Sequence, residues 1–409
     1  MSPALDTLTE DHAAVYDRQL RVWGVEVQRR LMEAKVLIIG LGGLAAEVAK
    51  NIVLAGVGTV ALVDDTPASA AAPGNFLVEP CTASASASAS AENSRSVAEV
   101  SAATLQAMNP LVSVRVEPGP PSAAALLAAT GAPAPDDNDL APPRPESSMA
   151  AQAEAEALRS LVSRYDTVVS CGLALREVAA LDELCRLYGK QLFAGSVRGA
   201  SSFVFADLGP KHTYTVKGEI GEKVVEYGTF QDAMKADLST VNKRTHPLYL
   251  VVRGESKLPG AVLLGAVRVC MSCWEFEKEH SRPAAGLGDA AAVQAIAQRL
   301  AEAAAAAKAG AGAGAAAATA ALPEGLVEGF VLDGGRGREG AVAPGAAVEA
   351  MEAEAEATPL GELAPVCAVV GGVMANNLLR AVSQVNPPLR NLFFYSFFVR
   401  DGLGVEEYF

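Results

Sequence analysis

Two short segments of this sequence carry residues suited to phosphate chemistry. The segment Tyr16–Gly24, YDRQLRVWG, places Arg18 and Arg21 beside a tyrosine and one of only two tryptophans in the chain. The segment 40–45, GLGGLA, follows an apolar run and opens a helical pattern. Arginine offers phosphates a planar, permanently charged donor, and a glycine-rich turn lets backbone N–H groups approach phosphates at a positive helix terminus. For the arginines, the structural alternative is a surface helix whose guanidinium groups stay solvated.

The elements that would position the glycine loop form a βαβ unit. Residues 36–40, VLIIG, are a continuous apolar run, which is typical of a strand buried on both faces of a parallel sheet. Apolar residues then recur at helical spacing over 44–55 until Gly56 ends the helix, and 59–64, TVALVD, predicts the next strand. A right-handed crossover makes the two strands parallel.

Strands and helices alternate along the rest of the chain. We expect strands at 112–116, 166–170, 191–195 and 202–207, helices at 95–108 and 174–188, a buried helix at 364–383 and a closing strand at 391–398. This alternation predicts an α/β protein with a doubly wound, Rossmann-like sheet. In the buried helix, Pro365 suits the first turn, and Gly371-Gly372 allows close backbone approach.

The domain organisation follows from changes in composition. Residues 1–209 form the first part of the α/β domain, 210–362 a small inserted unit, and 363–409 the C-terminal helix and closing strand of the same domain. Stretches without apolar periodicity lie near 83–91 and 118–158, and at 285–322 and 334–360. We expect these Ala-rich insertions to be flexible or frayed-helical surface segments, with transient helix near 290–308.

Charge and cysteine content exclude several classes of function. The net charge of −14 argues against general binding of nucleic acid or anionic membranes. We find no signal segment and no unbroken apolar run of membrane-spanning length, so we expect a soluble, intracellular protein. The six cysteines are scattered, as reduced thiols would be. Cys270 and Cys273 form a single C-x-x-C pair, which lacks the second pair of a structural zinc site, so no metal site is predicted.

Five blocks in order carry a family resemblance. They are Tyr16–Gly24, VLIIGLGGLAAEVAKNIVLAGVGTVALVDD, MNPLVSVRV, FADLG and APVCAVVGGVMANNLLRAVSQ. As an ordered set they resemble the activating enzymes of ubiquitin-like modifiers, and within them the smaller, non-catalytic subunits of heterodimeric SUMO-activating enzymes. The resemblance implies a ThiF/MoeB-type adenylation fold.

The resemblance also implies a division of labour between two subunits. One active half binds ATP and Mg²⁺ and attaches AMP to the C-terminal glycine of the modifier, after which a cysteine of that partner takes the acyl group as a thioester. The family's phosphate-binding arginine is missing from 73–77, PGNFL, its lysine from 93–96, NSRS, and its metal-binding aspartate from 170–176, SCGLALR. Each lost contact of this kind removes about 3 kcal/mol of charge stabilisation.

We therefore expect the local nucleotide site to be vestigial. Gly40, Gly42, Gly43 and Asp64 would remain as scaffold, and this chain would bind no cofactor of its own. Two other interpretations of the site stay open. Asp64, 24 residues after Gly40, could hold a ribose in an NAD-dependent oxidoreductase. A homodimeric sulfur-carrier adenylyltransferase would require a metal-binding aspartate and a phosphate arginine, which we do not find.

The catalytic cysteine of the family has a deceptive counterpart. Pro80-Cys81-Thr82 matches the sequence context of the family's nucleophile, but it lies in the nucleotide-binding half, ahead of a serine-alanine run. Nothing nearby would depress the pKa of Cys81. We do not assign Cys81 a thioester role, and we expect Cys367 to be a core residue.

The resemblance assigns the two arginines to another subunit. In adenylating dimers of this type the arginine of the YxRQ segment reaches the triphosphate in the partner's site, and that residue is Arg18 here, with Arg21 as a secondary candidate. The implied partners are the large catalytic subunit, SUMO and, indirectly, the SUMO-conjugating enzyme; the equivalent subunit for NEDD8 is the alternative. We expect residence in the nucleus and also in the cytoplasm, with nuclear import through the partner because no strong basic cluster is present.

Overall fold

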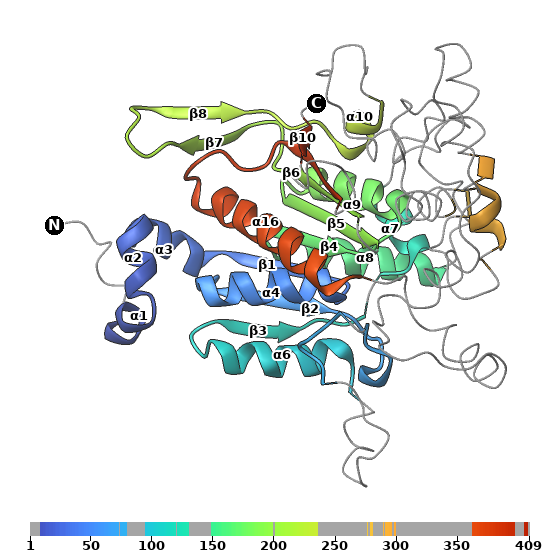
Figure 1. Cartoon of the computed structure of the whole chain (residues 1–409), viewed down its shortest axis with the longest axis horizontal. Helices are drawn as coiled ribbons and strands as arrows, with labels where there is room; N and C mark the ends of the chain where they lie inside the picture. The colour runs from blue at the N-terminus through green and yellow to red at the C-terminus, as the bar shows by residue number, and fades with distance from the viewer. Residues whose placement is uncertain are drawn as a thin grey trace, which may run out of the picture.

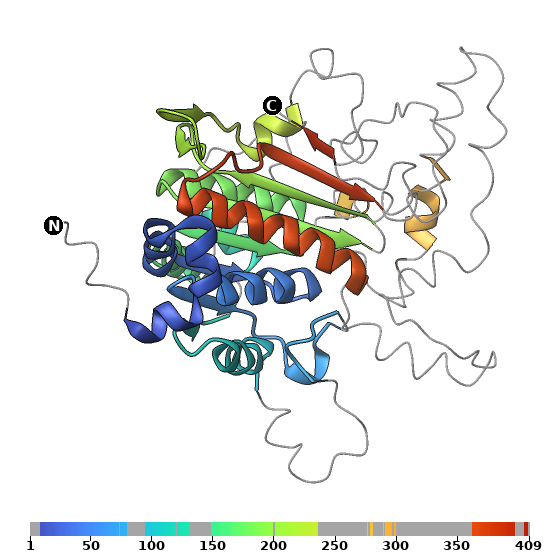
Figure 2. The same cartoon turned by 60° about the vertical axis from the view of Figure 1, so that its left-hand side comes forward.

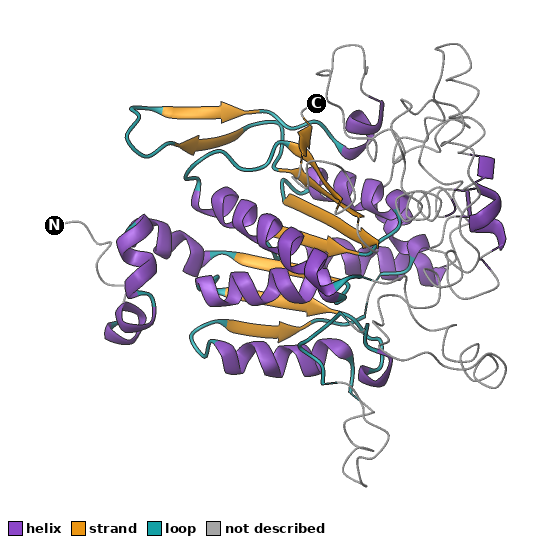
Figure 3. Cartoon of the chain, in the orientation of Figure 1, coloured by secondary structure: helices purple, strands orange, loops and turns teal. Residues whose placement is uncertain are grey.

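The computed structural model describes residues 9–72, 74–79, 95–119, 121–130, 149–198, 201–235, 362–396 and 405–407, with positions 276, 279–280, 289, 291–296 and 298–299. These residues build a twisted sheet with helices on both faces (Figures 1 and 3). The prediction of a doubly wound α/β fold is confirmed.

The described helices and strands follow the predicted alternation closely. The helices are α1 (Glu10–Val15), α2 (Asp17–Trp23), α3 (Val25–Glu33), α4 (Gly43–Ala55), the 3₁₀ turn η2 (Ala68–Ala70), α6 (Val97–Met108), α7 (Ala123–Thr130), α8 (Met149–Ser163), α9 (Leu175–Leu187), α10 (Phe230–Lys235) and α16 (Ala364–Ser383). The strands are β1 (Lys35–Ile39), β2 (Thr59–Val63), β3 (Ser113–Val116), β4 (Thr167–Cys171), β5 (Gln191–Arg198), β6 (Ser201–Asp207), β7 (His212–Thr215), β8 (Glu222–Val225), β9 (Asn391–Ser396) and β10 (Val405–Glu407).

The strand order gives the sheet a switch point between two central strands. The order is β10-β9-β6-β5-β4-β1-β2-β3. Strands β1 to β5 run parallel, while β6, β9 and β10 add antiparallel pairs. The chain leaves β1 for β2 on one side and reaches β4 on the other, so the direction of winding reverses between β1 and β4. In open α/β sheets, ligands bind beyond the carboxyl ends of the strands at such a switch point.

Strand β1 is buried on both faces because successive side chains point to opposite sides. Val36 and Ile38 belong to the cluster beneath α4, α6 and α16, and Leu37 and Ile39 to the cluster beneath α7, α8 and α9. All four side chains are fully buried. A short apolar run with no polar alternation therefore predicted the central strand correctly.

Helices α4 and α16 lie side by side on one face of the sheet, as Figure 2 shows. A Cβ atom on Gly371 would stand 2.5 Å from the Glu47 Cβ, whereas one on Gly372 would meet nothing within 4 Å. The predicted close approach is thus confirmed for Gly371 and not for Gly372. Pro365 lies in the first turn of α16, and Gly56 ends α4 in the left-handed conformation with φ of 85°.

The C-terminal strand completes the same sheet. Strand β9 pairs with β6 in antiparallel register, with Phe394 opposite Phe203, so the predicted closing strand is confirmed. The hairpin β7–β8 extends away from the sheet (Figure 1). Helix α16 is the one described helix long and apolar enough to cross a membrane, but it packs on α4 and β6 as a core helix.

The expectation for residues 118–158 is wrong where the structure describes them. Helix α7 and the first part of α8 fall in this stretch, and they bury Leu126, Ala129 and Ala155 against the sheet. Alanine side chains fill the shallow space between these helices and the sheet. The sequence of these helices therefore shows no strong contrast between an apolar and a polar face. Residues 291–296 are helical, in line with the expected helix there. The segments 83–91 and 334–360 lie outside the described residues.

Candidate functional site

The glycine loop follows β1 at the switch point of the sheet. The Gly40 N–H donates to the Val63 carbonyl at 3.0 Å. Gly40 has φ of 80°, and a Cβ atom there would stand 2.4 Å from the Cys171 carbonyl oxygen at the end of β4. Glycine is therefore required where β1 and β4 approach each other.

Asp64 holds this loop in place. One carboxylate oxygen accepts the Leu41 N–H at 2.8 Å, and the other accepts the Thr66 N–H at 3.0 Å. Both oxygens are thus engaged by the backbone of the chain itself. This arrangement gives no support to an NAD-dependent oxidoreductase, in which the carboxylate would bind a ribose.

A buried asparagine also supports the loop. Asn75 donates its amide to the Leu41 carbonyl at 2.8 Å and accepts the Leu77 N–H at 2.9 Å. Asn75 is 3% exposed, so these bonds replace water almost completely. The segment around Asn75, which lacks the family's arginine, therefore stabilises the conformation of the loop.

The loop presents its N–H groups to a carboxylate of the same chain, that of Glu362. The Gly43 N–H donates to one carboxylate oxygen in a very short hydrogen bond, and the Leu44 N–H lies 3.4 Å from the other. Burial raises the pKa of Glu362, and the two N–H groups and the charge of Arg198 oppose that rise. The sequence analysis did not identify Glu362. The one sign of it in the sequence is an acidic side chain just before a predicted buried helix.

The turn after β4 offers no separate acidic ligand at the switch point. Residues 172–176 read GLALR, and the first carboxylate beyond them, Glu177, accepts the Ala174 N–H at 2.8 Å as the cap of α9. Burial raises the pKa of Glu177. In the described part of the chain, no group of three or more His, Cys, Asp or Glu side chains is placed to hold a metal ion.

The N-terminal segment is anchored through its aromatic residues. Tyr16 is 1% exposed, and its hydroxyl accepts the Asn109 amide at 2.9 Å. Trp23 donates its indole N–H to the Gln28 side chain at 3.1 Å, and Gln28 donates in turn to the Ala55 carbonyl at 3.0 Å. The segment is therefore fixed to the C-terminal end of α4.

The two candidate arginines of α2 have different surroundings. Arg21 forms an ion pair with Asp17 one turn earlier, with 2.9 Å between nitrogen and oxygen. Arg18 is exposed, and no hydrogen bond or ion pair of its side chain is found among the described residues. Arg18 and Val22, 66% exposed, lie one turn apart on α2 and share a face. Val25 and Leu54, 42% and 46% exposed, lie on adjoining elements.

Arg18 lies far from the glycine loop of its own chain. The neighbouring Gln19 reaches the Leu54 carbonyl at 3.5 Å, at the C-terminal end of α4. The loop lies at the N-terminal end of the same helix, which is 13 residues long. At 1.5 Å per residue the two ends are about 20 Å apart. Figure 1 shows α1 to α3 at the end of the sheet where β1 begins. The arginine and the loop therefore form two separate sites.

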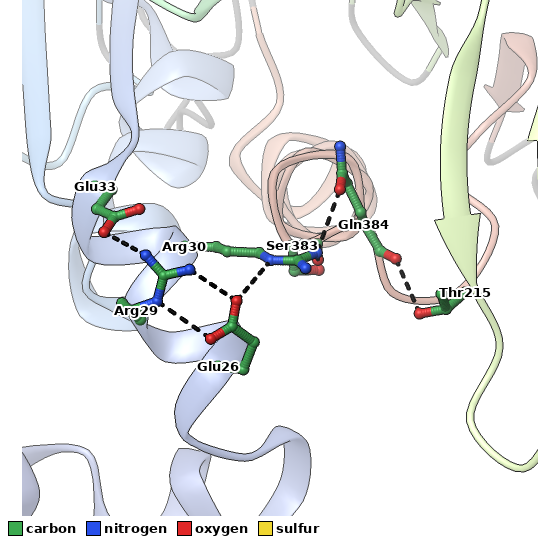
Figure 4. A network of polar contacts seen from close by, with 7 residues as sticks. All are labelled: Glu26, Arg29, Arg30, Glu33, Thr215, Ser383 and Gln384. Carbon is green, nitrogen blue, oxygen red and sulfur yellow. Dashed lines mark hydrogen bonds and ion pairs between the residues drawn. The ribbon is translucent and has the colours of Figure 1, made fainter. Parts of the chain in front are cut away.

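A polar network fixes α3 to the C-terminal end of α16 (Figure 4). Arg30 donates to the Ser383 carbonyl at 2.8 Å and to the Gln384 side chain at 3.3 Å. The Gln384 carbonyl accepts the Thr215 N–H of β7 at 2.9 Å. A cation at the carboxyl end of a helix is favoured by the helix dipole. The network ties α3, the end of α16 and the hairpin together.

The cysteines within the described residues are buried. Cys171, Cys185 and Cys367 are free thiols in the core, and burial raises the pKa of each. The expectation that Cys367 is a core residue is confirmed. Cys81 and the pair Cys270 and Cys273 lie outside the described residues.

The strand order, the switch point and the glycine loop define a protein of the Rossmann-like nucleotide-binding class. The family model of the ThiF family matches residues 16–71 and 86–402. The chain therefore belongs to the ThiF family.

Curated relatives resemble the chain over almost its whole length. It is 28% identical to SUMO-activating enzyme subunit 1A of Arabidopsis thaliana over 408 residues, which are 98% of this chain and 97% of that protein. It is 26% identical to SUMO-activating enzyme subunit 1 of Homo sapiens over 392 residues, 95% and 93% of the two chains. The corresponding rat protein is 25% identical over 402 residues, 98% and 95% of the two chains. The resemblance predicted from the ordered motifs is confirmed.

Proposed function

We propose that this chain is the smaller, non-catalytic subunit of a heterodimeric SUMO-activating enzyme. The pair adenylates the C-terminal glycine of SUMO and then forms a thioester on a cysteine of the large subunit. Similarity to subunit 1 of SUMO-activating enzymes from plants and mammals over almost the full chain supports this role. ATP and Mg²⁺ belong to the large subunit in this proposal.

One observation carries the division of labour. The backbone N–H groups of the glycine loop are engaged by Glu362 of the same chain, while Arg18 projects from the surface at the opposite end of α4. A chain that bound and used its own ATP would need donors and cations at one place. Here they are about 20 Å apart, as the length of α4 shows.

The loop of this chain does not fit ATP with Mg²⁺. The Gly43 and Leu44 N–H groups, which would face a phosphate, point at a carboxylate. Beyond β4, Glu177 is used as a helix cap. We therefore assign no step of the reaction to this loop.

Arg18 supplies the contribution of this chain to adenylation. Its guanidinium group is exposed on a helix that Tyr16 and Trp23 fix to the body of the protein. Delivered to the partner's site, such a group neutralises charge that develops on the transferring phosphates, and it couples catalysis to assembly. The exposed apolar side chains of Val22, Val25 and Leu54 suit a surface that is covered in the pair.

The test is SUMO-dependent pyrophosphate–ATP exchange by the reconstituted pair. We expect Arg18→Ala to leave the heterodimer intact by gel filtration and to lower exchange by ~10²-fold, the loss typical of one preorganised charge contact. Arg18→Lys should recover only part of the rate, because an ammonium group lacks the planar fork.

Arg21→Ala is the matched control, because Arg21 is on the same helix but already paired with Asp17. We expect its exchange rate to remain close to that of the wild-type pair. Unchanged exchange for Arg18→Ala would remove Arg18 from the mechanism, and equal losses for both variants would contradict the assignment of the contact to Arg18 alone. Exchange with NEDD8 in place of SUMO would redirect the proposal to the other modifier.

We also propose that the pair works in the nucleus and that this chain enters with its partner. The acidic net charge of −14 gives the chain no general basic character for independent import. A fluorescently tagged chain should accumulate in the nucleus only when the large subunit is co-expressed. Nuclear accumulation without the large subunit would contradict import through the partner.

A further inference from the structure

Glu362 is a partly buried carboxylate that the proposed reaction does not use. It lies at the N-terminal end of α4, where the Gly43 and Leu44 N–H groups converge on its two oxygens. A helix N-terminus carries a partial positive charge, and these N–H groups have no partner within the helix. The carboxylate therefore satisfies both the free donors and the positive end of the helix.

The loop is shaped around this side chain. A Cβ atom on Gly42 would stand 2.5 Å from a Glu362 carboxylate oxygen, and one on Gly43 would stand 3.1 Å from the same oxygen. The space that glycines leave open for a phosphate in loops of this kind is filled here by the carboxylate. A phosphate would meet an anion that is already bound to the two N–H donors. Two like charges held at the same donors repel each other strongly.

The position of Glu362 in the chain keeps the carboxylate at the loop. Glu362 immediately precedes Leu363, the N-cap residue of α16, and α16 packs on α4 through Gly371. Because Glu362 belongs to the same chain as the loop, its binding to the loop is intramolecular. The carboxylate therefore has a high effective concentration at the loop. A ligand could take the loop only if the Glu362 carboxylate moved away from the Gly43 and Leu44 N–H groups. Burial raises the pKa of Glu362, and the two N–H donors and the charge of Arg198 oppose that rise.

We propose that Glu362 is an internal substitute for a nucleotide phosphate and that it closes the glycine loop of this chain to nucleotides. The loop has kept the backbone geometry of an anion site, and its anion is now part of the protein. Removal of the carboxylate should therefore uncover a site for phosphate-type anions. This inference deepens the proposed absence of an ATP site in this subunit, but it requires neither SUMO nor the large subunit.

The experiment measures binding of inorganic pyrophosphate and of ATP, both without and with Mg²⁺, to the full chain by isothermal titration calorimetry. We compare the wild type with Glu362→Ala and Glu362→Gln. The expected result is weak or undetectable binding to the wild type and pyrophosphate binding at least about tenfold tighter to Glu362→Ala, since charge-assisted hydrogen bonds to two backbone donors become available. Glu362→Gln should show a smaller gain, because the amide still fills the space.

Glu99→Ala is the matched control. Glu99 accepts the Ser96 N–H at 2.8 Å in a capping box at the start of α6, so this change also removes a carboxylate from a helix N-terminus, but one without a glycine loop. It should gain no pyrophosphate binding. A gain equal to that of Glu362→Ala would mean that any uncapped helix binds the anion, which contradicts the proposal.

A second measurement covers the case in which Glu362→Ala folds poorly. Pyrophosphate should raise the melting temperature of Glu362→Ala and leave that of the wild type unchanged, because a ligand stabilises only the form that binds it. Wild-type protein that binds pyrophosphate as tightly as the variant would overturn the proposal, and so would a variant without any gain in binding or in melting temperature. Neither result depends on adenylation, so the proposed function would be judged separately.

Discussion

Arg18 and Arg21 show how residues of one type on one helix acquire different roles from their neighbours. Arg21 meets Asp17 one turn earlier, whereas Arg18 shares its face of α2 with the exposed Val22. Exposed ion pairs contribute little to stability, typically under about 1 kcal/mol. The pairing of Arg21 therefore matters mainly because it withdraws that cation from other partners.

At the same scale, the Tyr16 hydroxyl anchors the segment that carries Arg18. Tyr16→Phe removes the acceptor of the Asn109 amide, but that amide keeps its second bond, at 2.8 Å to the Val53 carbonyl. We expect a loss of about 1 kcal/mol in the free energy of unfolding, the net value of one buried hydrogen bond. Urea unfolding of the full chain measures it.

Tyr188→Phe is the control for this prediction, because Tyr188 is 37% exposed at the end of α9. It should change the free energy of unfolding by less than about 0.5 kcal/mol. Equal effects of the two substitutions would show that the buried Tyr16 hydroxyl contributes no more to stability than an exposed tyrosine hydroxyl does.

The sequence predicted part of the residue-level site. Local patterns indicated the glycine loop and the scaffold position of Asp64 at the end of β2. Glu362 could not be predicted, because it is 319 residues from Gly43 in the chain and meets it only through the packing of α16 on α4. A contact of that kind leaves no spacing in the sequence to recognise.

At the scale of elements, the pair of glycines in α16 tests the packing against α4. Gly371→Ala places a Cβ atom against Glu47, and the backbone of α4 lies 3.4 Å away at the Leu44 carbonyl. We expect a destabilisation of about 1–3 kcal/mol from overpacking. The midpoint of thermal or urea unfolding measures it.

Gly372→Ala is the adjacent control on the same helix. A Cβ atom there meets nothing within 4 Å. Because alanine favours helix more than glycine does, this change should stabilise the protein by up to about 1 kcal/mol. Destabilisation of similar size by both substitutions would mean that the contact between α4 and α16 is not the cause.

Elements with strong patterns were predictable, and elements built on alanine were not. Strands β1 and β2 are short, mainly apolar runs that are buried on both faces, so the local sequence indicated them. Helix α7, AAALLAAT, is apolar on all sides and has no amphipathic period, yet Leu126 is fully buried. Its role depends on the sheet that it covers, which the local sequence does not contain.

At the scale of the whole molecule, the pH dependence of stability should include a contribution from Asp182. This residue is 1% exposed on α9, and its carboxylate accepts the Phe230 N–H of α10 at 2.6 Å. Burial, and then the nearby charge of Asp207, raise the pKa of Asp182 well above its usual value. The folded state therefore retains a proton that the unfolded state has released.

The sign of the effect follows from that retained proton. Stability from Asp182 is fully present below the ordinary carboxyl pKa of about 3.9 and is lost as pH rises through the folded-state pKa, by at most about 1.4 kcal/mol per pH unit. Asp182→Asn cannot ionise and can still accept the Phe230 N–H. The stability of Asp182→Asn relative to the wild type should therefore increase with pH across this window.

Urea unfolding at several pH values measures this difference. Glu156→Gln, a change at the surface of α8, should follow the wild-type profile. Parallel profiles for Asp182→Asn and the wild type would contradict the assignment of a raised pKa to Asp182.

The pairing of β9 with β6 has a consequence for how the protein is made. Residues 391–396 supply that strand, and the support of α3 at Ser383 and Gln384 is also synthesised late. A nascent chain on the ribosome that has not reached these positions has neither a completed sheet nor a fixed seat for its first helices. Shortened products of interrupted synthesis that end before Ser383 would therefore lack both the closing strand and the contacts that fix α3.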